Sequence, residues 1–396
     1  MQLREPNSRV TMNDVALEAG VSPMTVSYTY NRPERVSAAT RARVLQAAAM
    51  LGYAGPDPTA RSLRYGATHT VGVVLGEHLT YAFDDPQAVA FLAGIAEVCA
   101  ERGYGLLIVP TGAGDEDRDR AVAAAVDAYI VWTTTVDDPI LDAVCSTRRP
   151  VVIHGGPDRD GTTLVSIDNR SAARVVATEV FATARRPAVL SFPIDRRRIT
   201  FLQDGLDPEA VAYPVTRDRL AGYRDAAQNL GIDWSHVPVG VCRTNDEGEA
   251  RIVMRQLLVS APDLDAVAAM GDQLALGAYR EATGPLRVSG FDDSDIARAH
   301  QITTVAQSMR DQGASCASAA LGDPAPDHRD AWRLVRRSST AGDTGALTPS
   351  CIVTEHKPER EASNGRTIPY DRVVVPELAQ HHGKLTVRGQ DQTTGE

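Results

Sequence analysis

The sequence predicts a small all-α head followed by a two-lobed α/β body with parallel sheets, and three features support this fold class. In residues 10–53, glycine and serine residues separate short helical segments. From residue 71 onward, continuous apolar runs of strand length alternate with segments of helical period, which is typical of parallel sheets covered by helices on both faces. The runs are too many for one such sheet, so we expect two lobes with a ligand cleft at the carboxyl ends of the strands.

The head is expected to contain three short helices within residues 10–53. Thr11 starts the first helix with a capping-box-like pattern, and Gly20 ends it as a glycine in the left-handed conformation would. Ser22 and Ser37 are N-cap candidates for the second and third helices. Helix, glycine turn and helix is the arrangement that places a second helix in the major groove of DNA.

The body is expected to alternate strands and helices along the chain. Strands are expected at Val71–Leu75, Gly105–Val109, Tyr129–Trp132, Val151–Ile153, Leu164–Ile167, Ala188–Phe192, Val239–Cys242, Ala266–Met270, Val288–Phe291 and Ile302–Val305. Helices are expected at Gln87–Arg102, Arg118–Val126, Pro139–Ser146, Arg170–Phe181, Arg219–Leu230, Glu247–Ser260, Gln273–Ala282 and Arg310–Leu321. Trp332–Thr340 is a candidate final strand, and the polar tail 341–396 is expected to be disordered.

Charge is distributed unevenly along the chain. The 396 residues carry a formal net charge of −10. Residues 1–70 nevertheless hold eight arginines and five acidic residues, a net charge of +3, which leaves −13 for the remainder. Such asymmetry indicates a nucleic-acid contact at one end of the chain. Because an acidic body repels DNA, we expect only the head to touch it.

Several classes of protein and site are not expected. The chain has no run of about 18 uncharged apolar residues, and its start lacks the apolar core of a signal peptide, so we expect a cytoplasmic protein without a membrane span. The five cysteines are scattered and form no CxxC pair, so neither a zinc site nor a disulfide framework is expected. No cofactor is expected. No GxxxxGK[ST], GxSxG or HExxH pattern indicates an enzyme. The arginine run 196–198 is expected to be solvated.

Several motifs occur in a fixed order along the chain. Residues 10–31 read VTMNDVALEAGVSPMTVSYTYN, in which Asp-Val-Ala, Ala-Gly-Val-Ser and Thr-Val-Ser follow one another at close spacing. The further motifs are VSAATRARVLQAAAMLGY at 36–53, ARSL at 60–63, RLAGYRDA at 219–226, GDQLALGA at 271–278, VSGFDD at 288–293 and ITTVAQ at 302–307. Together they resemble the LacI (lactose-repressor) family of bacterial transcription regulators, over about residues 10–340.

The resemblance implies that the helix starting at Ser22 is the recognition helix. Pro23 and Met24 occupy its base-facing positions, where apolar side chains can contact a thymine methyl but cannot form bidentate hydrogen bonds. Tyr28 stands where the family usually has arginine, which changes the expected operator preference, and Arg35 is a further candidate DNA contact. The residues expected to contact phosphates or to orient the helix are Thr11, Ser22, Thr25, Ser27, Asn31 and Thr40.

The segment from Ala60 to Leu63 matches the hinge helix of the family. The resemblance implies that this segment folds on DNA and that Leu63 wedges into the minor groove at the operator centre. Such a wedge unstacks a base step in exchange for a bent, better-covered duplex. Without the head motif, Leu63 would simply be an exposed linker leucine.

The resemblance also implies an effector site in the body. Arg219 matches the effector arginine of the family and Asp292 its effector aspartate. An arginine fork and a carboxylate that face one cleft suit vicinal hydroxyls or another small polar ligand. Asp272, Phe83 and Asp84 are further candidates. The alternatives are structural ion pairs for the charged residues and an ordinary loop for Phe83 and Asp84.

We therefore expect a DNA-binding transcription regulator, a repressor controlled by a small, sugar-like effector. Its body should resemble periplasmic sugar-binding proteins, and it should bind a pseudo-palindromic operator as a homodimer. The alternative is a solute-binding protein that only senses or carries a small molecule. The expected parts are a head at 1–56, a hinge at 57–69, lobe 1 at about 70–167 and 306–325, lobe 2 at about 168–304 and 326–340, and the tail.

Overall fold

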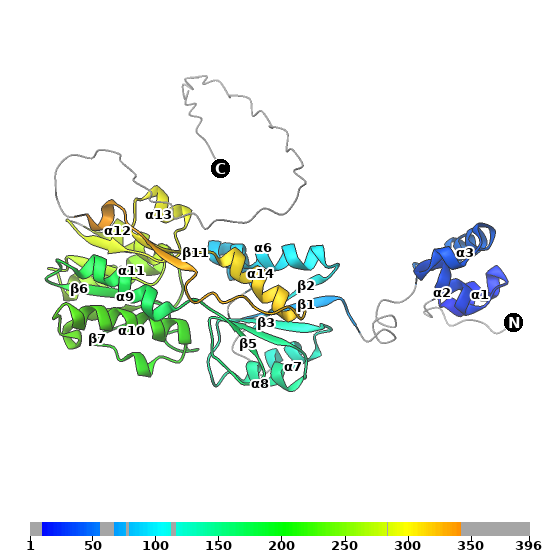
Figure 1. Ribbon diagram of the computed structural model, residues 1–396, viewed down its shortest axis with the longest axis horizontal. Coiled ribbons are helices and arrows are strands. Elements are labelled where there is room, and N and C mark those ends of the chain that lie inside the picture. Colours follow the sequence, from blue (N-terminus) through cyan, green and yellow to red (C-terminus); the bar gives the residue numbers. More distant parts are fainter. Residues whose placement is uncertain (1–9, 56–66, 77–78, 112–115, 283, 342–396) are drawn as a thin grey trace, which may run out of the picture. The chain divides into compact units, whose positions relative to one another are not determined.

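The computed structural model describes residues 10–55, 67–76, 79–111, 116–282 and 284–341 (Figure 1). The expected hinge residues Ala60 and Leu63 lie outside this part of the chain, as does the tail from residue 342. Within the described residues, no helix has both the length and the apolar character needed to cross a membrane.

The head consists of α1 (Met12–Ala19), α2 (Pro23–Asn31), the 3-10 turn η1 (Pro33–Arg35) and α3 (Ala38–Leu51). Its helices begin after the N-cap residues that the sequence predicts, and α3 extends to Leu51, three residues beyond the expected end at Ala48. Thr11 and Asp14 form a complete capping box, and Gly20 ends α1 with a φ of 64°. The buried residues that join the three helices are Val15, Ala16, Val26, Val44, Ala47 and Ala48.

The first lobe is built on a five-stranded parallel sheet in the order β2-β1-β3-β4-β5. Its strands are β1 (Thr70–Leu75), β2 (Gly105–Pro110), β3 (Ala128–Trp132), β4 (Val151–His154) and β5 (Thr163–Val165). Its helices are α5 (Tyr81–Asp84), α6 (Pro86–Glu101), α7 (Glu116–Ala123), α8 (Pro139–Ser146) and α14 (Met309–Ala320). Helices α6 and α14 cover one face, and α7 and α8 cover the other (Figure 1).

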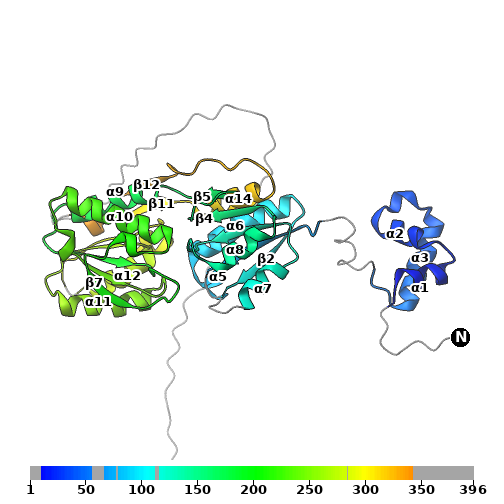
Figure 2. The same cartoon turned by 90° about the horizontal axis from the view of Figure 1, so that it is seen from below.

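The second lobe is built on a sheet in the order β10-β9-β6-β8-β7. Its strands are β6 (Pro187–Ser191), β7 (Phe201–Asp204), β8 (Pro238–Val241), β9 (Ala266–Ala269) and β10 (Arg287–Ser289). Its helices and 3-10 turns are α9 (Asn169–Phe181), η2 (Pro208–Ala210), α10 (Pro214–Asn229), η3 (Trp234–His236), α11 (Glu247–Ser260), α12 (Asp272–Glu281) and α13 (Asp295–Ala299). Helices α9 and α10 cover one face and α11 and α12 the other (Figure 2).

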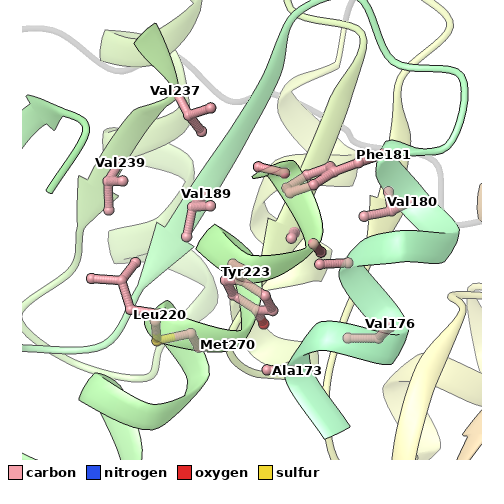
Figure 3. Close-up of a cluster of buried hydrophobic side chains, with 14 of the residues drawn as sticks. Ala173, Val176, Val180, Phe181, Val189, Leu220, Tyr223, Val237, Val239 and Met270 are labelled. Carbon is pink, nitrogen blue, oxygen red and sulfur yellow. The ribbon is translucent and has the colours of Figure 1, made fainter. Parts of the chain in front are cut away.

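The face covered by α9 and α10 holds a large apolar core (Figure 3). Val176 and Phe181 from α9 and Tyr223 from α10 pack against Val189 and Val239 on neighbouring strands. The two helices approach closely because Gly222 has no side chain: a Cβ at this position would collide with the backbone of α9 at Arg170. This packing holds α10, and therefore Arg219, firmly against the sheet.

The chain passes between the lobes more than once. It leaves the first sheet after β5, returns after β11 (Thr304–Gln307) to form α14, and then reaches β12 (Trp332–Val335) and η4 (Ser338–Thr340). β11 and β12 pair antiparallel in a separate two-stranded sheet. The strand expected at Ile302–Val305 is therefore shifted toward Gln307, and the last strand ends earlier than expected, at Val335.

Other elements also differ from the sequence prediction: the short helices α5 and α13 were not expected, and neither was β7. As an antiparallel edge strand, β7 is exposed along much of its length and has no continuous apolar run. Helix α10 begins at Pro214 rather than at Arg219. Proline is favoured in the first turn of a helix, so this residue was an available start signal.

Candidate functional site

A cavity lies between the two lobes, and both lobes contribute to its wall. Tyr81 and Trp132 come from the first lobe, whereas Phe192 and Tyr213 come from the second. The polar side chains in the wall are Gln87, Thr133, Arg198, Thr216, Arg219, Asn245, Asp292 and Gln307. Aromatic walls with a few convergent polar groups are the usual make-up of a small-molecule site.

Arg219 is the most firmly held polar residue of the cavity wall. Its Nε donates to Asn169 Oδ1 at 2.9 Å, and its Nη1 donates to the carbonyl oxygen of Met270. The guanidinium carbon lies 3.5 Å from the centroid of the Phe291 ring, a cation–π contact. Burial lowers the pKa of Arg219, but an arginine remains charged in proteins. The structure thus presents an oriented positive charge to the cavity.

Asp292 brings a carboxyl group to the same cavity. Its backbone has a φ of 109°, which a residue other than glycine rarely adopts and which is typical of functional sites. Its N–H donates to the carbonyl oxygen of Val305 at 2.7 Å, and its Oδ1 accepts from Gln307 Nε2 at 2.7 Å. Burial raises the pKa of Asp292, and the nearby Arg219 opposes this rise. The cavity therefore has both a strong donor and an acceptor.

Asp272 lies behind the cavity wall rather than in it. Its Oδ2 accepts from the backbone N–H and the hydroxyl of Ser294, each at 2.8 Å, and its Oδ1 accepts from Thr304 Oγ1 at 2.8 Å. A Cβ on Gly290 would collide with this carboxylate. Asp272 thus fastens the loop that carries Asp292 and does not line the cavity.

Phe83 and Asp84 also do not line the cavity. Both are exposed on α5, and 64% of Phe83 is accessible. Tyr81 from the same short helix lines the cavity instead, and Phe83, two residues further on, lies on another side of the helix. The adjacent Asp85 is buried and accepts from Asn245 Nδ2 at 2.9 Å, a hydrogen bond between the lobes.

The arginine run departs from its expected solvated state at Arg198. This side chain lines the cavity, and its Nη2 donates to the carbonyl oxygen of Gly76 in the first lobe at 3.0 Å. Arg196 is more exposed and lies 3.8 Å from Asp138 of the first lobe. Residues at the carboxyl ends of predicted strands, such as Phe192 at the end of the strand expected at Ala188–Phe192, were an available signal for the cavity wall that the sequence analysis did not use.

The N-terminal end of α2 is exposed on the surface of the head. Ser22 caps this helix, since its Oγ accepts from the Thr25 N–H at 3.1 Å, and Pro23 and Met24 are exposed. Ser27 is buried, and its hydroxyl accepts from Asn31 Nδ2 at 3.4 Å. Thr11 and Thr40 both belong to helix caps, on α1 and α3.

Two family models match the chain: the bacterial regulatory proteins of the lacI family at residues 11–55, and the periplasmic binding protein-like domain at residues 196–340. The HTH-type transcriptional regulator Rv3575c of Mycobacterium tuberculosis is 37% identical, over 78% of this chain and 89% of that protein. The ribose operon repressor of Escherichia coli is 30% identical, over 72% of this chain and 84% of its own. The chain belongs to the LacI family.

Solved structures agree with this assignment. A LacI-family regulator from Corynebacterium glutamicum is 30% identical, with a TM-score of 0.64, and covers 85% of this chain and 100% of its own. The complex of the transcriptional regulator CelR with cellobiose is 27% identical, with a TM-score of 0.57, and covers 84% of this chain and 100% of its own. This LacI-family chain is thus a DNA-binding transcriptional regulator, not an enzyme or a solute carrier.

Tyr28 of α2 and Arg35 of η1 form a close pair in the head. The Arg35 guanidinium lies 5.9 Å from the centroid of the Tyr28 ring, within cation–π range. Tyr28 is partly buried and Arg35 is exposed. The Tyr28 ring of α2 thus lies beside an exposed arginine side chain.

Proposed function

We propose that this regulator is a repressor whose affinity for operator DNA is controlled by a sugar or related polyol in the cavity between its lobes. The observation that carries the proposal is the meeting of Arg219 and Asp292 in one aromatic-walled cavity. CelR, which shares the fold, binds cellobiose.

The cavity suits the chemistry of a sugar. The fixed Arg219 fork donates hydrogen bonds to hydroxyl oxygens, while the Asp292 carboxylate accepts from hydroxyl protons. Trp132 and Phe192 offer flat apolar surfaces for the C–H face of a sugar ring. Both polarities are needed because every hydroxyl is at once a donor and an acceptor.

The head would read DNA through α2. Pro23 and Met24 would contact thymine methyl groups, and the neighbouring hydroxyls and amides would contact phosphates. The family-derived parts are a head at 1–56, a hinge at 57–69 and a cleft-bearing body at 70–340. Two copies would bind a pseudo-palindromic operator, with Leu63 of each hinge at its centre, in the cytoplasm where that DNA lies.

Control of operator affinity would follow from a change in the arrangement of the two lobes. A ligand that bridges them favours one lobe arrangement, and the hinge and dimer geometry would then change with it. Hydrogen bonds that already join the lobes, from Asn245 to Asp85 and from Arg198 to Gly76, are candidates for the contacts that a ligand strengthens or breaks.

The test is a calorimetric titration of the full chain with ribose, cellobiose, glucose and inositol, paired with DNA binding to an operator selected from random sequences. At least one of these compounds should bind and should change operator affinity. Asp292→Asn should weaken that binding at least tenfold. Asp295→Asn is the matched control, because the Asp295 side chain is 98% exposed and lies outside the cavity wall. Equal ligand binding by both variants would contradict the proposed site.

A further inference from the structure

Four side chains form a continuous hydrogen-bonded series that crosses from the second lobe to the first. Asp292 Oδ1 accepts from Gln307 Nε2 at 2.7 Å, and Gln307 Oε1 accepts from Gln312 Nε2 at 3.0 Å. Gln312 Oε1 then lies 3.0 Å from His154 Nε2. The series starts in the cavity wall and ends on strand β4 of the first lobe.

The direction of every hydrogen bond in this series follows from its first member. Gln307 turns its NH₂ group toward Asp292 Oδ1, which accepts the hydrogen bond. Its carbonyl oxygen then faces Gln312, which must in turn offer its own NH₂ group. Gln312 is left with its carbonyl oxygen toward His154, so the histidine must donate from Nε2. The hydrogen bond accepted by Asp292 is thereby linked to the histidine tautomer three side chains away.

His154 is placed to respond to that selection. It is buried, and burial lowers its pKa to about 4, so the ring is neutral and carries one proton. Its Nδ1 is buried without a hydrogen-bond partner among the described residues, which matches a bare acceptor nitrogen. The ring centroid lies 4.7 Å from that of Phe91 and 5.9 Å from that of Trp132.

The middle of the series lies on a rigid element. Gln312 belongs to α14, which packs so closely on α6 that a Cβ on Gly94 or on Gly313 would collide with the backbone of the other helix. Gln307 is the last residue of β11, at the point where the chain passes from the second lobe into α14. The series therefore joins Asp292 to a closely packed pair of helices in the first lobe.

We propose that Gln307 and Gln312 are positioning residues that form a directional amide relay, which orients the Asp292 carboxyl group and links its hydrogen bonding to the tautomer and packing of His154. The relay itself depends only on these four side chains. Its use in reporting effector occupancy to the first lobe rests on the function proposed above.

The test is nuclear magnetic resonance of the isotope-labelled histidine rings in the full chain, without DNA or sugar, with the His154 signal assigned by its loss in His154→Gln. The wild type should show His154 protonated at Nε2. Asp292→Asn, which replaces the carboxyl group at the far end by an amide, should shift the His154 nitrogen signals because each bond in the relay changes its polarisation. In a Gln312→Met background, the same Asp292→Asn change should no longer shift them.

The control is Cys316→Ala, which removes buried packing on the same helix without touching the relay. In that background the Asp292→Asn shift should persist at its wild-type size. Gln312→Leu serves in place of Gln312→Met if the latter fails to fold by circular dichroism. Protonation of His154 at Nδ1, or a shift that passes unchanged through a Gln312 variant, would overturn the relay.

Discussion

The head and the cavity of this regulator assemble their functional residues in opposite ways. In the head, the candidate DNA contacts from Thr11 to Thr40 lie within one short stretch, and local caps set their orientation. In the cavity, Trp132, Arg219 and Asp292 come from distant parts of the chain and meet only because strands and their loops converge. The functional residues of the head can therefore be predicted from neighbouring residues in the sequence, whereas those of the cavity depend on the fold of the whole body.

Removal of residues 1–66 tests the first half of that comparison most strongly. DNA binding should be abolished, because the positive charge and α2 lie in this segment, while sugar binding by the body should remain. Fluorescence anisotropy with the selected operator and calorimetry would measure the two. For the intact chain, the logarithm of the binding constant should fall with log salt by about 0.9 per phosphate contact. Operator binding by the truncated chain would contradict the assignment of DNA binding to the head.

The second prediction is that low pH destabilises the body through His154, a residue that the head lacks. His154 accepts a proton at a pKa of about 4 when folded and at 6.5 in its ordinary state, so between these values the unfolded chain binds more protons. Stability of the body should therefore fall as the pH drops through this window, by up to roughly 3 kcal/mol from this residue. Thermal unfolding at several pH values would show it, and His154→Gln should flatten the dependence. An equal slope in that variant would contradict the assignment.

Arg219→Ala tests whether the cavity can be disabled without touching the head. Loss of this charged donor should weaken ligand binding by about 1.5–3 kcal/mol. Operator affinity without ligand should stay within twofold of wild type. Arg224→Ala is the matched control, because Arg224 lies on the same helix but pairs with Asp207 outside the cavity. If Arg219→Ala still responded to the sugar as wild type does, the cavity would not be the effector site.

Substitutions of Tyr28 test whether DNA recognition by the head also depends on the contact between Tyr28 and Arg35. Tyr28→Leu removes the ring that lies beside Arg35, and should change affinity or base preference in each half-site by about 1–3 kcal/mol if Arg35 reads a base. Tyr28→Phe keeps the stacking and should keep the preference, whereas Tyr28→Arg should strengthen binding and alter the preference. Selection from randomised half-sites measures all three. Unchanged selections throughout would place Tyr28 away from the DNA.

Substitutions of Ser22 have the smallest expected effect. They separate its role as the N-cap of α2 from its expected contact with a DNA phosphate. Ser22→Ala removes the cap of α2 and should destabilise the head by about 1 kcal/mol. Ser22→Asp keeps a capping oxygen, so it should restore the stability while its charge repels phosphate and weakens DNA binding. Thermal unfolding and anisotropy would distinguish the two. If Ser22→Asp bound DNA as wild type does, Ser22 would not face a phosphate.

The sequence prediction succeeded where the signal is local or repeated. The capping box at Thr11, the glycine that ends α1 and the alternation of apolar runs with helical segments led to most helices and strands. It failed at β7, whose exposed residues carry no apolar run, and it placed Phe83 and Asp84 in a cavity that they do not line. The family motifs named Arg219 and Asp292, but no motif pointed to Arg198 or Tyr81.

By itself, the sequence determined the fold class, the family and the uneven charge, because caps, periodicity and motif order involve residues close together in the chain. The tertiary structure decided which polar groups share a cavity and which support it from behind, as Asp272 does. It also decided the pairing of His154 with Gln312, which are 158 positions apart. Such contacts depend on the order of strands and the packing of α14 on α6, and these set distances that no local pattern encodes.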